Sequence, residues 1–145
     1  MKLTLVKNVK SPTRATPKSA GLDFYVPNDF GNDVWLYSKS NINIASGVKC
    51  EVPKGYALIA FNKSGRALEG LQVGACVIDE DYQGEIHLHV YNTTTHEIQI
   101  KPGQKLVQFI LLPVLYEPVE IVYEFQMFLN STSKRKEGGF GSTGL

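Results

Sequence analysis

The sequence predicts an all-β fold, a sandwich or barrel assembled from many short strands. Apolar and polar residues alternate with a period of two in several short runs, which is typical of half-buried strands. Two continuous apolar runs, residues 55–61 and 106–112, indicate strands covered on both faces. Turn-forming residues recur at intervals of roughly a dozen residues, as expected for short antiparallel strands.

The alternating runs give most of the predicted strands in chain order. They are marked by apolar positions at Leu3 and Leu5, Val34 and Leu36, Ile42 and Ile44, Ile86, Leu88 and Val90, and Ile98 and Ile100. Turns are expected at Pro27-Asn28, Gly31-Asn32, Ser46-Gly47, Pro53-Lys54-Gly55 and Lys101-Pro102-Gly103. Residues 119–129 are rich in Val, Ile, Tyr and Phe, so we expect a strand there rather than a helix.

The 145 residues are sufficient for one domain with a substantial core. After residue 130 the sequence becomes polar and then glycine-rich, which is typical of a segment that is mobile when free. We therefore expect a β-structured domain at residues 1–133 and a flexible tail at residues 134–145.

Composition and charge exclude several classes of protein. Hydrophobic residues make up 43% of the chain and charged residues 20%, which fits a globular protein rather than a disordered or membrane one. A net charge of +1 gives no overall attraction to nucleic acid or membranes, so neither is an expected partner. Without a recognisable signal peptide, and with no paired spacing of Cys50 and Cys76, we expect reduced thiols and a cytoplasmic location, in a host cell if the source is viral.

The stretch from Ala75 to Glu85 carries the strongest signal for chemistry. Its apolar residues lead directly into Asp79, Glu80 and Asp81, and Tyr82 follows. A carboxylate at the end of a buried strand is partly desolvated, which raises its basicity and suits it to proton abstraction. Asp79 is the first acid to leave the apolar strand and is the candidate general base, whereas Glu80 is expected to be solvated.

The glycine-rich tail is a second candidate site. Residues 139–144 match G-x-G-x-x-G, but a dinucleotide motif must open a helix, and the chain ends one residue later. The glycine N–H groups, the hydroxyls of Ser142 and Thr143 and the basic residues 134–136 can wrap a polyphosphate. Phe140 suits a stacking role, because no core requires an aromatic ring among glycines. A disordered polar tail is an equally good interpretation.

Other polar residues are weaker candidates. Residues 63–65 place a cation and a hydroxyl at a strand end, although such segments are mostly ordinary surface. Asp23 alone is typical of a hydrogen-bonded turn residue rather than a metal ligand. Gln108 lies in an apolar strand and must find partners, so an internal hydrogen bond is favoured. His87 and His89 share one strand face without a third ligand, which favours a solvated face over a metal site.

Taken in order, these segments resemble the five short motifs of the trimeric deoxyuridine triphosphatase (dUTPase) family. The counterparts are residues 20–24, 63–65, 77–85, 102–110 and 135–144. The third and fifth motifs are highly specific, and the resemblance covers nearly the whole chain. It implies a jelly-roll-like β-barrel that forms a homotrimer with shared active sites. It also implies Mg²⁺-dependent hydrolysis of dUTP to dUMP and pyrophosphate, which lowers dUTP and supplies dUMP for thymidylate synthesis.

The resemblance also implies a role for individual residues. Asp79 is the base that activates the water attacking the α-phosphorus, Arg135 acts like an arginine finger, and Asp23 holds Mg²⁺ through water. Tyr82 packs on the deoxyribose, while the backbone of residues 71–78 reads uracil. The implied substrate-binding residues are Lys63, Ser64, Gly65, Val73, Cys76, Val77, Ile78, Tyr82, Gln108, Phe140, Gly141, Ser142 and Thr143.

The sequence departs from the family pattern at several positions. Lys63 stands in place of an arginine, so we expect weaker phosphate binding unless Arg66 turns inward. Cys76 and Lys136 stand in place of glycines, and Asn62 in place of a proline. Residues 29–40 and 116–133 are longer than in a minimal member, and no function is assigned to them.

Three alternative functions remain. A related dCTP deaminase is disfavoured, since such enzymes carry Trp in place of Tyr82 and a catalytic glutamate in place of His89. A non-catalytic regulatory trimer on the same fold is disfavoured by the presence of Asp79, Arg135 and Phe140. An unrelated β-sandwich interaction module would leave the ordered motifs unexplained.

Overall fold

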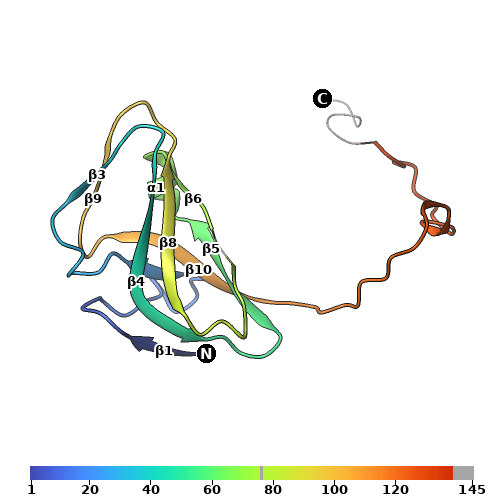
Figure 1. The fold of residues 1–145 in the computed structure, drawn as a ribbon, viewed down its shortest axis with the longest axis horizontal. Coiled ribbons are helices and arrows are strands. Elements are labelled where there is room, and N and C mark those ends of the chain that lie inside the picture. The colour runs from blue at the N-terminus through green and yellow to red at the C-terminus, as the bar shows by residue number, and fades with distance from the viewer. Residues whose placement is uncertain (76, 139–145) are drawn as a thin grey trace. The chain divides into compact units, whose positions relative to one another are not determined.

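The computed structural model describes residues 1–75 and 77–138, and the chain is built almost wholly from antiparallel strands (Figure 1). In chain order the strands are β1 (Lys2–Leu5), β2 (Leu22–Tyr25), β3 (Val34–Leu36), β4 (Asn41–Glu51), β5 (Tyr56–Asn62), β6 (Leu71–Val73), β7 (Val77–Ile78), β8 (Glu85–Asn92), β9 (Ile98–Ile100) and β10 (Lys105–Pro113). A short helix, α1 (Ser64–Leu68), joins β5 to β6, and a 3-10 helix spans Glu124–Gln126. The all-β prediction is confirmed.

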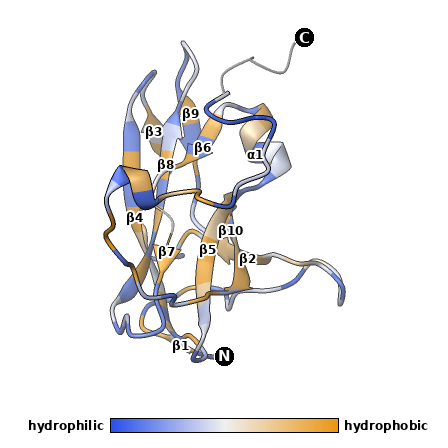
Figure 2. Ribbon diagram, turned by 90° about the vertical axis from the view of Figure 1, so that its right-hand side faces the viewer, coloured by the Kyte–Doolittle hydropathy of each residue, from blue (hydrophilic) through white to orange (hydrophobic). Residues whose placement is uncertain are grey.

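Two four-stranded sheets share one hydrophobic core. Their strand orders are β1-β4-β8-β6 and β2-β10-β5-β7, and β3 pairs with β9 in a smaller sheet. Ile44 and Leu88 enter the core from the first sheet, and Phe24 and Phe109 from the second, with 4.5 Å between the two ring centroids. Figure 2 shows hydrophobic residues concentrated along β2, β5 and β10. This arrangement is the jelly-roll-like sandwich that the sequence predicts.

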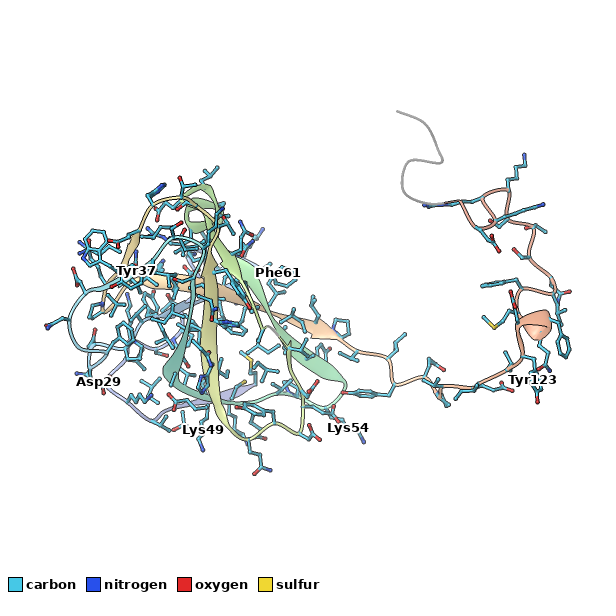
Figure 3. All side chains as sticks on the ribbon, turned by 45° about the horizontal axis from the view of Figure 1, so that its top comes forward. Asp29, Tyr37, Lys49, Lys54, Phe61 and Tyr123 are labelled. Carbon is cyan, nitrogen blue, oxygen red and sulfur yellow. The ribbon has the colours of Figure 1, made fainter. Side chains whose placement is uncertain are left out.

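The alternating strands lie where the period of two places them. In β8, for example, Ile86, Leu88 and Val90 are buried, while His87 between them is exposed. The continuous apolar runs also form strands, β5 and β10. Both strands carry buried residues, Ala57, Leu58 and Ala60 in β5 and Leu106, Val107 and Phe109 in β10, but the last residues of each strand are exposed. Phe61 near the end of β5, labelled in Figure 3, is 39% exposed.

Ser46 and Gly47 do not end a strand as predicted. They lie inside β4 at a β-bulge, where the register with β8 shifts between Ala45 and Lys49. Gly47 adopts φ +75°, a conformation that side chains disfavour, and its N–H donates to Glu85 Oε1 at 2.6 Å. The bulge bends β4 without removing it from the sheet, so the glycine indicates a bend rather than a chain reversal.

The residues from Tyr116 onward form a separate unit, which contains no strand within its described part. The strand predicted at residues 119–129 is therefore wrong. Val119 and Ile121 are 90% and 94% exposed, because an apolar segment becomes a strand only beside a partner strand. Tyr123, labelled in Figure 3, stacks on Phe125 with 5.8 Å between ring centroids. Among the described residues, no helix has the length and apolar character needed to span a membrane.

Candidate functional site

Asp79 directly follows β7 and lines a pocket of about 340 Å³. Strand β7 pairs with β5 through Ile78 and Val77, so it forms the edge of the second sheet. Ala75 and His89 contribute to the same pocket. The apolar run before Asp79 predicts the strand end, and the structure adds that this strand is at a sheet edge beside a concavity.

The expected desolvation of Asp79 is absent, because its side chain is exposed. Strand β7 is only two residues long and has a neighbour on one side, so its end is not enclosed. The Asp79 carbonyl accepts a turn hydrogen bond of 3.2 Å from the Tyr82 N–H. Within residues 1–75 and 77–138, no cation pairs with the Asp79 carboxylate. The carboxylate is thus available as a hydrogen-bond acceptor.

Glu80 and Tyr82 fix the turn that carries Asp79. Glu80 Oε2 accepts a 2.5 Å hydrogen bond from the Gly55 N–H, so the predicted solvated role of Glu80 is wrong. The Tyr82 hydroxyl donates to the Glu85 carbonyl at 2.9 Å. The Tyr82 ring lies so close to Gly84 that an added Cβ there would collide with it. Both contacts hold the tyrosine ring in one orientation beside the pocket.

The segment from β6 to β7, residues 71–78, contributes to another wall of the pocket and is called the hairpin below, although β6 pairs with β8 and β7 with β5 rather than with each other. β6 pairs with β8 through Val73 and Val90, and the two strands lie side by side in Figure 1. The Gly74 N–H donates to the His89 carbonyl at 2.9 Å. Val73 and Ile78 are half-buried, Val77 is exposed, and Cys76 lies outside the described residues.

His87 is exposed, as expected for a solvated strand face, but His89 on the same face is half-buried and contacts the hairpin. The ring is half-buried, and its Nδ1 accepts a 3.1 Å hydrogen bond from the Ala75 N–H in the hairpin. Alternation along β8 identifies only the face on which His89 lies. The contact depends on the pairing of β6 with β8, which no local pattern reports.

Asp23 lies in β2 rather than in a turn, and its side chain is buried at 3% exposure. Lys63 Nζ forms an ion pair with Oδ1, and Lys105 Nζ lies 2.9 Å from Oδ2. Burial raises the pKa of Asp23, but Lys105 and Lys63 outweigh burial and hold that pKa below its ordinary value. The turn interpretation is therefore wrong, because two cations stabilise a buried carboxylate within a strand.

Lys63 precedes α1, in which Ser64 and Gly65 are exposed. Arg66 does not turn toward Asp23 to compensate for the lysine, because its guanidinium pairs with Glu69 at 2.6 Å. The ammonium of Lys63 is thus the cation of this segment that faces the buried acid.

Gln108 lies opposite Asp23 on β2 and opposite Phe61 on β5. Its Nε2 donates to the Asn62 carbonyl at 2.8 Å, which confirms the predicted internal hydrogen bond. Its side chain also lies so close to Gly21 that a Cβ added there would collide with Oε1. Register across β2, β10 and β5 therefore brings Asp23, Lys63 and Gln108 together.

Asn62 joins this group to the hairpin, and no single-residue signal in the sequence identifies it. Its Oδ1 accepts a 2.7 Å hydrogen bond from the Val73 N–H, and its Nδ2 donates to Gln72 Oε1 at 2.6 Å. Its own carbonyl accepts the bond from Gln108. The structure thus places the predicted residues of the β-sandwich in two groups that share Asn62.

The remaining predicted residues lie in the C-terminal unit or outside the described chain. Arg135 is exposed, and its Nε donates to the Gly138 carbonyl at 2.7 Å. Phe140, Gly141, Ser142 and Thr143 lie outside the described residues.

The metal-binding capacity of the described chain is limited. In residues 1–75 and 77–138, no group of three or more His, Cys, Asp or Glu side chains is arranged to hold a metal ion. Asp23, the candidate acid for a metal, is buried, and its two oxygens are paired with Lys63 and Lys105. Mg²⁺ retains several waters and is commonly bound through substrate phosphates. The described residues therefore provide no cluster of protein ligands that would enclose such an ion.

Comparison with known proteins identifies the family. The dUTPase family model matches residues 7–144. The deoxyuridine 5'-triphosphate nucleotidohydrolase of Paramecium bursaria Chlorella virus 1 is 36% identical over 143 residues, covering 97% of this chain and 94% of the relative.

Two solved structures share the fold. The dUTPase of Staphylococcus bacteriophage 80alpha with dUpNHpp superposes with a TM-score of 0.82 and 22% identity, covering 99% of this chain and 98% of that one. The dUTPase of phage phi11 of S. aureus, described with a structural Mg(II) ion, has a TM-score of 0.75 and 21% identity, covering 86% and 97%. Since the family model spans almost the entire sequence, and a viral relative of similar length supports it, the chain belongs to the dUTPase family.

Proposed function

We propose that this chain hydrolyses dUTP to dUMP and pyrophosphate by attack of water on the α-phosphorus. The observation that carries the proposal is the position of Asp79, an exposed carboxylate without a cationic partner in the described chain, directly after β7 and beside a pocket. The names of the relatives support the choice of dUTP. The reaction serves nucleotide metabolism in the cytoplasm, where it lowers dUTP and supplies dUMP.

In this mechanism Asp79 acts as the general base. Its carboxylate accepts a proton from the attacking water, whose oxygen forms a new bond to the α-phosphorus. The bond from that phosphorus to the bridging oxygen breaks, and this oxygen leaves with pyrophosphate. A positioned base typically contributes about 10²–10⁴-fold to the rate. The anchored turn of Glu80 supplies that positioning.

The base and sugar are assigned to the pocket. The backbone of the hairpin, with Val73, Cys76, Val77 and Ile78, reads uracil through its N–H and C=O groups. The Tyr82 ring, held by its hydroxyl and by its contact with Gly84, packs on the deoxyribose and leaves no room for a 2′-hydroxyl. A fixed ring suits this role, because a mobile one would admit the larger sugar.

The phosphates are assigned to the group around Asp23. Lys63, Ser64, Gly65 and Gln108 contact phosphate oxygens in this proposal, and Asp23 would hold a water of Mg²⁺. When bound, Mg²⁺ supplies charge neutralisation on the phosphates. Lys63 offers one ammonium where a guanidinium would bind in a bidentate manner, so phosphate binding by this segment alone is weaker.

The tail completes the site in this proposal. Residues 134–145 act as a segment distinct from residues 1–133 and come from another subunit of a homotrimer. Arg135 neutralises charge as the bond breaks, Phe140 stacks on uracil, and Gly141, Ser142 and Thr143 close on the γ-phosphate. Sharing the site between subunits explains how a small domain with a net charge of +1 handles a triphosphate.

One assay tests the function. The protein is incubated with Mg²⁺ and dUTP, UTP, dTTP or dCTP in turn, and pyrophosphate and ammonia are measured separately. We expect pyrophosphate from dUTP and little from the other three nucleotides. Ammonia from dCTP would replace this function with deamination, and no product from any nucleotide would indicate a binding protein. Comparable pyrophosphate from all four would refute the specificity.

A further inference from the structure

We propose that two side chains, Asn62 and His89, hold the hairpin of residues 71–78 in its substrate-binding conformation. Both are positioning residues, since they act on the hairpin backbone and not on the reacting atoms. The inference rests on the proposed role of the hairpin in reading the base. It adds the means by which this chain keeps the hairpin in place.

His89 holds one side of the hairpin through a defined tautomer. The Ala75 N–H can only donate, so Nδ1 of His89, 3.1 Å away, must accept. The ring proton is then on Nε2, which lies 3.1 Å from Asn41 Oδ1 and donates to it. Asn41 on β4 thus orients the imidazole so that the lone pair of Nδ1 faces the Ala75 N–H of the hairpin.

The hairpin backbone at Gly74 also contacts the imidazole ring of His89. A Cβ added at Gly74 would collide with Nδ1 and Cε1 of His89 and with the Tyr91 ring. The His89 and Tyr91 rings contact each other, with 4.8 Å between centroids. Glycine permits this close approach, and the Gly74 N–H bonds to the His89 carbonyl at 2.9 Å. Both the backbone and the side chain of His89 therefore bind consecutive residues of the hairpin.

Asn62 holds the hairpin at β6. Its amide makes two hydrogen bonds there, to the Val73 N–H at 2.7 Å and to Gln72 Oε1 at 2.6 Å. Its carbonyl accepts the bond from Gln108, which belongs to the proposed phosphate-binding group. Asn62 therefore connects the hairpin to the proposed phosphate-binding group through hydrogen bonds.

These contacts lower the cost of binding, because a preorganised loop loses less conformational freedom when a ligand arrives. Loss of one contact leaves the hairpin with more conformations and one unpaired N–H. We expect the KM for dUTP to rise by about tenfold, and kcat to change by less than about threefold, since the base and the reacting atoms are untouched.

Paired substitutions at His89 separate the hydrogen bond from the packing. His89→Phe keeps a ring against Gly74 but removes the Nδ1 acceptor. His89→Asn loses the ring but places Oδ1 where Nδ1 lies. His96→Asn is the matched control, because His96 is exposed and outside both groups. The variants are compared by KM, kcat and melting temperature, and by the affinity for a non-hydrolysable α,β-imido analogue of dUTP.

We expect His89→Phe to raise the KM for dUTP about tenfold and to weaken analogue binding by a similar factor. His89→Asn should recover most of the parent KM and most of the analogue affinity. His96→Asn should match the parent protein in both. Asn62→Ala should change KM in the same direction as His89→Phe. A normal KM for His89→Phe would overturn the proposal. Equal losses in both His89 variants would also overturn it, since the acceptor would then not matter.

A second readout does not depend on catalysis. Two-bond ¹H–¹⁵N correlation spectra of the free protein report which imidazole nitrogen carries the proton. We expect the Nε2–H tautomer for His89, and a change of the Ala75 amide resonance in His89→Phe but not in His96→Asn. An Nδ1–H tautomer would refute the inference even if dUTP is hydrolysed. Absence of hydrolysis with the expected tautomer would instead refute the proposed function.

Discussion

Two carboxylates of this chain, Asp23 and Asp79, occupy opposite environments. Asp23 is buried in β2, with Lys63 and Lys105 against its two oxygens. Asp79 follows the edge strand β7, is exposed, and has no cation paired with it in the part of the chain that the structure describes. The first lies between two ammonium groups, and the second is open to solvent and to a ligand in the pocket.

The comparison shows why burial alone does not identify a general base. A carboxylate whose pKa is held low by adjacent cations takes up a proton poorly. Asp23 is such a group, so its charge is suited to holding cations in place. Asp79 lacks these partners, and the pocket supplies a place for substrate. The following changes test this division of roles.

The largest effect is expected for Asp79→Asn. An amide cannot accept the proton from water, so kcat should fall by about 10²–10⁴-fold. The melting temperature and the affinity for the imido analogue should stay near those of the parent, because the side chain is exposed. Asp81→Asn, at an exposed acid two residues further, is the control. Near-normal kcat in Asp79→Asn would remove it as the base.

Asp23→Asn should act on stability, in contrast to Asp79→Asn. The amide keeps the shape but removes the charge that both lysines contact. We expect the free energy of unfolding to fall by about 2 kcal/mol, below the usual range for a broken buried pair, because water can reach the partly exposed lysines. Urea unfolding measures this loss. An unchanged urea midpoint would show that the ion pairs do not stabilise the fold.

Lowering the pH should reduce the free energy of unfolding of the parent protein more than that of Asp23→Asn. Burial raises the pKa of Asp23, but Lys105 and Lys63 lower it further, so the folded value lies below the unfolded value of about 3.9. Its contribution to stability is therefore present above that unfolded value and is lost as pH falls through the folded pKa. Glu85 behaves in the same way, since Lys7 and the Gly47 N–H outweigh its burial.

The measurement is the free energy of unfolding between pH 5 and pH 2, in the parent and in Asp23→Asn. The parent should lose stability over the acidic part of this range, and the variant should lose less. Identical slopes would mean that Asp23 does not carry the pH dependence assigned to it.

The smallest effect is expected for Lys63→Arg. A guanidinium can pair with the Asp23 carboxylate and still offer a second edge to phosphate. We expect KM for dUTP to fall a few-fold, with little change in melting temperature. The steady-state KM and the melting temperature check this. A higher KM would show that the compact ammonium is required beside Asp23.

Sequence patterns predict this fold well where the signal is local. One face of β8 packs on the core, which produces the alternation of apolar and polar residues. Ile86 and Leu88 are therefore predicted as buried even when the neighbouring strands are unknown. The sequence does not distinguish the bulge at Gly47 from a turn, because a glycine with positive φ occurs in both. The segment at 119–129 was mispredicted, because strand propensity reflects packing against neighbours that its unit lacks.

The candidate site divides in the same way. The position of Asp79 at a strand end was predictable from the apolar run before it, but its exposure depends on β7 being an edge strand. The contacts of His89 with Ala75, and of Asn62 with Val73, arise from strand pairing and chain packing. The glycine before Asp23 predicts a turn, but Asp23 is in a strand, and its partner Lys105 on the neighbouring strand β10 is distant in sequence.

The most direct test of the central claim is the fate of the water oxygen. The protein is supplied with dUTP in ¹⁸O-labelled water, and both products are examined by mass spectrometry. Attack on the α-phosphorus predicts one ¹⁸O atom in dUMP and none in pyrophosphate. Label in pyrophosphate, or failure to form dUMP, would contradict the account.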